Sequence, residues 1–182
     1  MARTLVPLAQ GCEELEAITV IDLLRRAGVE VVSAGLDSQS VRASRGVVLV
    51  PDTTLEQVMN EPFDMIVLPG GLPGADNLNQ DPRIHTLLQT MYRNGKHVAA
   101  ICAAPKVLAS AGLLRGRKAT GYPGVLEKTG QTEIDIASSA VVRDGTVITS
   151  RGAGTAMDFA LELIEVLAGS ARRLEVEKAL VR

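Results

Sequence analysis

The sequence has no tryptophan and few other aromatic residues, only two Tyr and two Phe in 182 residues. Platforms for stacking nucleic acid bases are therefore nearly absent. Positive and negative charges nearly balance, with 19 basic and 21 acidic residues and a net charge of −2. No basic stripe with interleaved aromatic residues occurs, so the sequence does not indicate sequence-specific nucleic acid binding.

Cysteine is also scarce, since Cys12 and Cys102 are the only two. Two cysteines do not make a disulfide scaffold, and neither lies in a CxxC motif or in a His/Cys cluster with zinc spacing. We expect no metal site. The segment 1–11 is too short for a signal peptide or a membrane span. We therefore expect a cytoplasmic protein without membrane contact, in which both thiols stay free.

Short apolar runs alternate with amphipathic segments along the chain. We expect strands at the short apolar runs 4–9, 29–36, 47–50, 64–68 and 97–101. We expect helices at the amphipathic segments 14–27, 81–93, 103–111, 155–167 and 171–180. A β-hairpin turned by Asp144-Gly145 is expected at 140–150. Continuous apolar strands between amphipathic helices are typical of a mostly parallel sheet covered on both faces. The sequence predicts one doubly wound α/β domain over residues 1–182.

Ligands of such sheets bind beyond the carboxyl ends of the strands. Cys102 lies there, directly after the run HVAAI and before a helix that has Pro105 in its first turn. A nucleophile on a strand-to-helix elbow needs small neighbours, and Cys102 is flanked by alanines. The helix N-terminus favours thiolate, so we expect a lowered pKa for Cys102. The alternative is a buried, unreactive cysteine.

Glu16 is the candidate acid beside this thiol. It shares an apolar helical stripe with Val20, Leu23 and Ala27, whereas Glu13 and Glu14 do not. A carboxyl group buried there is shifted toward its neutral form and could exchange a proton with the thiol. The alternative is a carboxylate that only stabilises the start of the helix.

A glycine-rich loop, with Gly70 and Gly71, follows the apolar run at 64–68. Adjacent glycines let backbone N–H groups approach a ligand closely, and with the N–H of Ala103 they could form an oxyanion hole. The alternative is a tight loop without a ligand. No GxGxxG or GxxxxGK[ST] motif occurs, so no nucleotide cofactor is indicated.

A histidine base for the thiol is not evident. His97 begins the strand that ends before Cys102, so it lies at the opposite end of the sheet, roughly 16 Å away. His85 lies near the start of the helix at 81–93 and could reach the rim of the site or simply face solvent. The sequence therefore does not establish a Cys–His triad.

Four segments together resemble the ThiJ/PfpI superfamily, in the branch of the Parkinson-disease protein DJ-one, as a bacterial member. They are GCEELEAITVIDLLRRAG at 11–28, DMIVLPGG at 64–71, AAICAAP at 99–105 and TSRGAGTAMDFAL at 149–161. The resemblance covers essentially the whole chain. It implies a flavodoxin-like fold and a homodimer, with activities that include cofactor-free glyoxalase, deglycation and oxidative-stress sensing.

The resemblance also implies roles for single residues. Cys102 matches the oxidisable nucleophile, and Glu16 matches the neighbouring, usually protonated, glutamate. Gly70 and Gly71 match backbone N–H donors, and Arg26 and Arg45 match basic residues near the pocket and the dimer interface.

Two positions depart from the family pattern. Tyr122 stands where animal members carry His, so proton transfer falls on Glu16 or water, and strong glyoxalase activity is in question. Ala103 stands where protease and amidase members carry His, so we expect no peptidase activity. Cys12 is an extra thiol one loop from the site, and we expect it to be idle; the alternative is that it cross-links to or competes with Cys102 on oxidation.

Two hypotheses follow from these residues. The first is an enzyme that acts on methylglyoxal-type 2-oxoaldehydes and their glycated adducts through Cys102 and Glu16, without a metal or organic cofactor. The second is a redox sensor or stress chaperone that uses oxidation of Cys102 to the sulfinate. A third, in which the thiol is incidental to a structural homodimer, also remains open.

Overall fold

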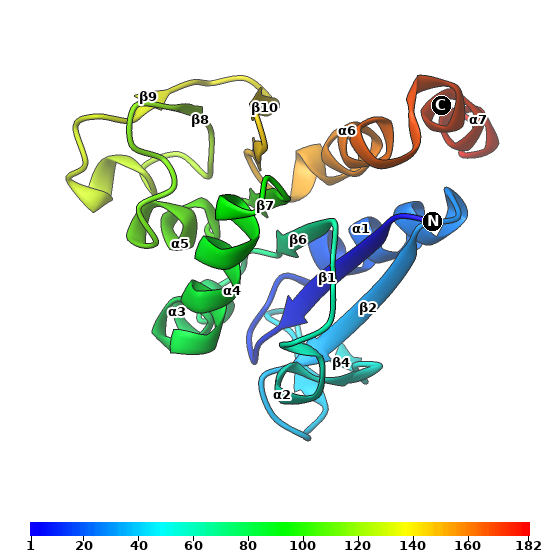
Figure 1. Ribbon diagram of the computed structural model, residues 1–182, viewed down its shortest axis with the longest axis horizontal. Coiled ribbons are helices and arrows are strands. Elements are labelled where there is room, and N and C mark those ends of the chain that lie inside the picture. Colours follow the sequence, from blue (N-terminus) through cyan, green and yellow to red (C-terminus); the bar gives the residue numbers. More distant parts are fainter.

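The structure is a computed structural model that describes residues 1–182. Its main sheet has seven strands in the order β10-β11-β7-β6-β1-β2-β5, and all neighbouring pairs are parallel except the β10–β11 hairpin (Figure 1). The strands are β1 (Arg3–Leu8), β2 (Glu30–Gly35), β5 (Thr53–Thr54), β6 (Met65–Leu68), β7 (His97–Ile101), β10 (Val141–Asp144) and β11 (Val147–Ser150). The expected parallel sheet and hairpin are confirmed.

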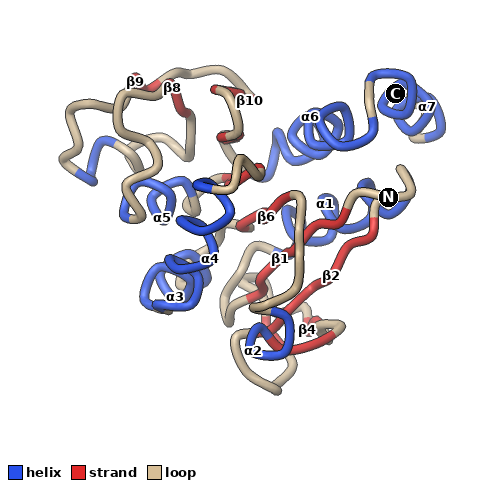
Figure 2. The backbone as a smooth tube through the Cα atoms, viewed as in Figure 1, coloured by secondary structure: helices blue, strands red, loops and turns tan.

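Helices cover both faces of this sheet (Figure 2). One face carries α1 (Glu14–Arg26), α6 (Ala156–Ala168) and, packed on α6, α7 (Ser170–Ala179); the other carries α2 (Leu55–Val58), α3 (Gly74–Gln80), α4 (Pro82–Arg93) and α5 (Pro105–Ser110). Successive strand residues point to opposite faces. Leu5 and Ile66 therefore join the core under α4, whereas Val6 and Val67 join the core under α1 and α6.

The short elements depart from the predicted pattern in several ways. The strand predicted at 47–50 is present only as Val48–Leu49 and lies outside the main sheet, whose edge is formed instead by the unpredicted Thr53–Thr54, paired with β2. The helix α3 was not expected, and α5 begins at Pro105, later than the predicted residue 103. Two small sheets pair β3 (Val41–Arg42) with β4 (Val48–Leu49) and β8 (Lys118–Ala119) with β9 (Asp135–Ile136), and two 3₁₀ turns, η1 (Glu127–Thr129) and η2 (Ala153–Thr155), complete the chain. None of the helices combines the length and apolarity that crossing a bilayer requires.

The parallel strands β1, β6, β7 and β11 end at the same edge of the sheet. The chain leaves β1 toward the face that carries α1, but leaves β6 toward the face that carries α3 and α4. The loops after these strands diverge, and such a divergence is where open α/β sheets hold their ligands. This edge therefore positions the candidate site.

Candidate active site

Cys102 occupies a sharp turn directly after β7. Its φ of 63° lies in the left-handed region, which is uncommon for a residue with a side chain and frequent at functional sites. Two backbone hydrogen bonds hold the turn: the Cys102 N–H donates to the Ser150 carbonyl at 3.0 Å, and the Cys102 carbonyl accepts from the Tyr122 N–H at 2.8 Å. The side chain is half-buried. The predicted elbow is confirmed.

Glu16 is fully buried at 0% exposure, in the first turn of α1. Its Oε2 accepts a hydrogen bond from the Gly70 N–H at 2.8 Å, while its Oε1 makes no hydrogen bond of ordinary geometry. Burial raises the pKa of Glu16 to about 7, although the Gly70 N–H and the Cys102 thiol act in the opposite direction. The expected burial and neutral shift of Glu16 are confirmed.

The pKa of Cys102 is shifted in the direction opposite to the prediction. Burial, followed by the negative charge of Glu16, raises the pKa of Cys102 to about 12, and the N–H groups of Gly71 and Ala103 only partly offset this. The expectation of a lowered pKa is wrong for two physical reasons. The helix α5 starts three residues later and has six residues, which makes its dipole weak at the sulfur, and burial penalises the thiolate.

Cys102 and Glu16 therefore titrate as a pair rather than as independent groups. Glu16 loses its proton before Cys102 does, which leaves a carboxylate within reach of the proton that the sulfur still holds. Transfer of this proton from Sγ to the carboxylate produces a thiolate beside a neutral acid without any change in net charge. The arrangement can thus supply both a nucleophile and a proton carrier.

The backbone N–H groups around the pair interact with different members of it. Gly70 donates to Glu16, so it is not free to face an oxyanion as the sequence suggested, whereas the N–H groups of Gly71 and Ala103 point to the sulfur. A Cβ on Gly70 would lie 2.7 Å from Cys102 Cβ and 2.8 Å from Glu16 Oε2. Only glycine allows the loop to approach both groups this closely.

Tyr122 and Gly152 flank the sulfur. A Cβ on Gly152 would lie 3.8 Å from Cys102 Sγ and 3.7 Å from Tyr122 Cδ2. Tyr122 is 57% exposed and, with Arg151, lines a cavity of about 320 Å³ whose lining does not include Cys102. Sequence reasoning did not single out Gly152, although its position just after the end of β11 was the available signal.

The two arginine candidates do not reach the pair within this chain. Arg26 forms an ion pair with Asp22 on the exposed side of α1, with Nε 2.9 Å from Oδ2. Arg45 is exposed, and its backbone N–H donates to Glu14 Oε1 at 2.9 Å in the turn between β3 and β4. No hydrogen bond joins either residue to Cys102 or Glu16.

The remaining candidate groups lie away from the sulfur. His97 starts β7, at the opposite end of the strand as predicted, and burial lowers its pKa. His85 Nε2 lies 2.8 Å from the Asn79 carbonyl oxygen and is engaged there. Cys12 is fully buried, and burial raises its pKa to about 12. No three His, Cys, Asp or Glu side chains are gathered as metal ligands would be.

Comparisons with known proteins agree with this geometry. The sequence profile described as "DJ-1/PfpI family" matches residues 2–166. Protein dj-1beta of Drosophila melanogaster is 44% identical over 178 residues, which are 97% of this chain and 95% of the fly protein. The glutathione-independent glyoxalase DJR-1.2 of Caenorhabditis elegans is 39% identical over 160 residues, 88% of this chain and 85% of the nematode protein.

Solved structures give the same result. The crystal structure of the fly DJ-1beta superposes with a TM-score of 0.95 at 43% identity, covering 99% of this chain and 97% of that one. A structure of Toxoplasma gondii DJ-1, described as oxidized, has a TM-score of 0.93 at 39% identity and covers 100% of this chain and 98% of that one. The flavodoxin-like fold class is confirmed. These relatives are eukaryotic, so they do not support the expected bacterial membership.

Proposed function

Because the chain belongs to the DJ-1/PfpI family, we propose that it is a cofactor-independent, cysteine-dependent glyoxalase for methylglyoxal-type 2-oxoaldehydes. The observation that carries the proposal is the geometry of the pair: the half-buried thiol of Cys102 on its sharp turn lies against the fully buried carboxyl group of Glu16. The nematode relative named as a glutathione-independent glyoxalase supports it. Glycated thiols and amines would be processed through the same pair, as a deglycase.

The reaction balances without an external oxidant or metal. Sγ of Cys102 adds to the aldehyde carbon of methylglyoxal, and the thiol proton, taken up by Glu16, passes to the new alkoxide to give a hemithioacetal. Glu16 then removes the C1 proton and delivers it to C2 through an enediol, which leaves a lactoyl thioester. Water hydrolyses the thioester, releasing lactate and restoring the thiol. The N–H groups of Gly71 and Ala103, which point to the sulfur, would stabilise the oxyanion that forms on the carbon bound to it.

We propose that the reaction is slow because position 122 carries a tyrosine. A phenol is a poorer proton carrier at neutral pH than an imidazole. Glu16, with a pKa of about 7, is matched to proton transfer at that pH. We therefore place proton transfer on Glu16 and give Tyr122 the role of a wall beside the sulfur.

Lactate formation from methylglyoxal tests the proposal. In wild-type protein we expect steady turnover, and in Cys102→Ser and Glu16→Gln we expect losses of roughly 10²–10⁴-fold, the range for removing a nucleophile's proton partner. Cys12→Ser is the matched control, because it removes the other thiol away from the pair and should keep wild-type turnover. Negligible wild-type turnover, or full activity in Glu16→Gln, would refute the mechanism.

A second candidate function is redox sensing without turnover. The structural neighbour described as oxidized favours it, and so does the half-buried sulfur with N–H donors on one side and a carboxyl group on the other. Two equivalents of peroxide would convert the thiol to the sulfinic acid with release of two waters. A protein that makes no lactate but gains two oxygen atoms on Cys102, measured by mass spectrometry, would support this function instead.

We propose further that the chain is a single domain and acts in the cytoplasm as a homodimer. Exposed apolar side chains on α1 and β4, namely Leu15, Ile18 and Val48, support the dimer, since the Glu14 carboxylate joins α1 to the loop beside β4. Two free thiols support a reducing compartment. Light scattering that gives a monomer mass would exclude the dimer, and activity lost on dialysis against EDTA would exclude a metal-free reaction.

A further inference from the structure

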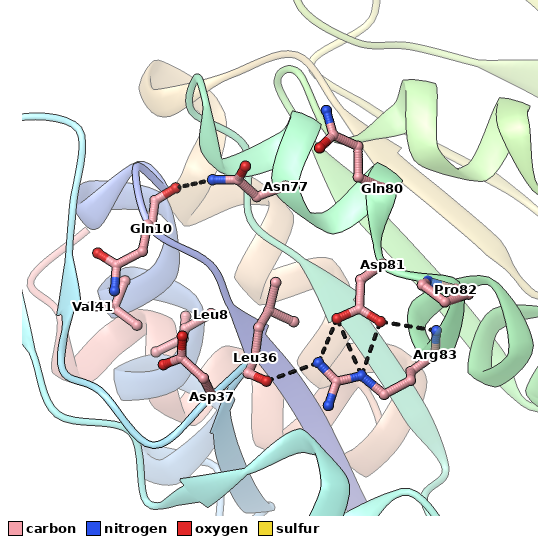
Figure 3. A pocket seen from close by; sticks show the side chains of 10 residues that line it. All are labelled: Leu8, Gln10, Leu36, Asp37, Val41, Asn77, Gln80, Asp81, Pro82 and Arg83. Atoms are coloured by element: carbon pink, nitrogen blue, oxygen red, sulfur yellow. Dashed lines mark hydrogen bonds and ion pairs between the residues drawn. The ribbon is translucent and has the colours of Figure 1, made fainter.

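A second cavity lies at the carboxyl edge of the sheet, apart from the Cys102 site. Its volume is about 620 Å³, within the range of small-molecule sites. It is bounded by the segments that follow β1 and β2, by α3 and by the start of α4 (Figure 3). None of its lining residues belongs to the thiol–carboxyl pair or to the loop around it.

The cavity has an apolar floor and a polar rim. Leu8 and Val41 are each 2% exposed and form the floor together with Leu36. The rim carries the carboxamides of Gln10, Asn77 and Gln80 and the charged groups of Asp37, Asp81 and Arg83. An apolar base below a ring of hydrogen-bonding groups suits a ligand with one apolar face and several polar substituents.

Two of the rim carboxamide side chains are already fixed by hydrogen bonds. The Gln10 carboxamide donates to the Ser40 carbonyl at 2.9 Å and accepts from the Arg42 N–H at 2.9 Å. Asn77 Nδ2 donates to the Gln10 carbonyl at 2.8 Å (Figure 3). Side chains held in this way cost little conformational entropy when a ligand binds.

Arg83 is fixed from two sides. Its guanidinium donates to both oxygens of Asp81 and, through Nη2, to the Leu36 carbonyl at 2.8 Å (Figure 3). The Asp81 carboxylate also caps α4 by accepting from the Arg83 N–H at 2.9 Å. The positive charge of Arg83 and the start of α4 are therefore both compensated by Asp81, which makes this end of the cavity unsuitable for an anion.

Several polar atoms on the rim remain without a hydrogen bond. They are the whole carboxamide of Gln80, Oδ1 of Asn77, Nη1 of Arg83 and Oδ2 of Asp37. This set contains donors as well as acceptors, and it carries one uncompensated negative charge, that of Asp37. A hydroxyl group, which both donates and accepts, can satisfy every atom of such a set.

We propose that this cavity binds an uncharged polyhydroxylated ligand of monosaccharide size. Its carbon face would lie on Leu8 and Leu36, and its hydroxyl groups would bond to Asp37, Asn77 and Gln80. With no aromatic side chain in the lining, stacking adds nothing, so binding depends on these hydrogen bonds. The inference does not depend on the chemistry of Cys102.

Titration of ¹⁵N-labelled protein with methyl α-D-glucopyranoside tests the proposal. This glycoside has no free aldehyde, so it cannot react with Cys102 or with lysine, and its binding is independent of the glyoxalase assay. We expect saturable shifts of the side-chain NH₂ signals of Asn77 and Gln80. Gln80→Ala and Asp37→Ala should each weaken binding about fivefold, the effect of one lost hydrogen bond.

Gln89→Ala is the matched control, since Gln89 is an exposed glutamine of α4 outside the cavity. It should bind the glycoside as wild type does. If Asp37→Ala disturbs the backbone spectrum, the exposed Gln80 variant decides. Absence of saturation, equal binding by Gln80→Ala, or saturation by methylammonium or inorganic phosphate in place of the glycoside would overturn the proposal.

Discussion

The two thiols of this chain have raised pKa values of about 12 for a shared reason and yet differ in what they can do. Burial is the largest cause for both Cys12 and Cys102, and a neighbouring glutamate is the second. Cys12 is sealed at 0% exposure, whereas Cys102 is half-buried and shares its proton with Glu16. We therefore expect access and a proton acceptor, more than the pKa alone, to decide which of the two thiols reacts.

The largest expected effect is on the labelling rates of the two thiols. Cys102 should react with iodoacetamide at neutral pH roughly 10³-fold or more faster than Cys12, because Cys12 reacts only after local opening that costs several kcal/mol. Peptide mass spectrometry after timed labelling measures both rates in the same sample. Equal rates in the native protein would show that the difference in burial does not control reactivity, and labelling in urea provides the control in which the rates should converge.

The second effect is on the pH dependence of stability. The pKa of Glu16 rises from its ordinary 4.5 to about 7 on folding, so the folded state keeps a proton that the unfolded state releases. This favours the folded state fully below pH 4.5, and the benefit is lost as the pH rises through about 7. The loss amounts to about 3 kcal/mol.

Urea denaturation of wild type and Glu16→Gln at several pH values between 4 and 8 measures this loss. The free energy of unfolding of wild type should fall relative to the variant over that interval. Taking the difference cancels the carboxylates with lowered pKa values, such as Asp52, Asp64 and Asp81, which act in the opposite direction. Two parallel curves would contradict the burial of an ionisable Glu16 as the source of the slope.

The smallest effect concerns the packing around Cys12. A Cβ on Gly74 would lie 2.5 Å from both N and Cα of Cys12, and backbone atoms cannot move aside easily. Gly74→Ala should therefore lower the free energy of unfolding by about 2 kcal/mol and make Cys12 faster to label. Gly154→Ala is the control, because a Cβ there meets open space. Unchanged stability of the Gly74 variant in urea denaturation would count against this packing.

The long elements of the fold were predictable because their patterns are local. The buried runs of β6 and β7 and the hairpin of β10 and β11 follow from apolar sequence and from one Asp-Gly turn. The helix α3 was missed because it begins at glycine and contains mostly polar residues, and it is held by the Ala75 N–H bond to Gly71 and by tertiary contact of Leu78. Such contacts do not appear in a one-dimensional pattern.

The site was predictable in its members but not in its electrostatics. The turn at Cys102 and the burial of Glu16 both followed from sequence patterns, the elbow after an apolar strand and the apolar helical stripe. The sign of the Cys102 shift was wrong, because a helix terminus can be read from sequence whereas the desolvation of a sulfur depends on everything packed around it. The hydrogen bond from the Gly70 N–H to Glu16 likewise could not be predicted from the sequence, because it depends on how the two segments pack in three dimensions.

The left-handed backbone at Cys102 has a consequence for how this chain can change. A residue with a side chain costs about 1–2 kcal/mol more in that region than glycine would, so selection for stability alone would replace the sulfur with glycine. Under the proposed function, the sulfur of Cys102 is the reason that this position carries a side chain in spite of that cost. At position 102, backbone stability therefore favours glycine, whereas the proposed reaction needs cysteine.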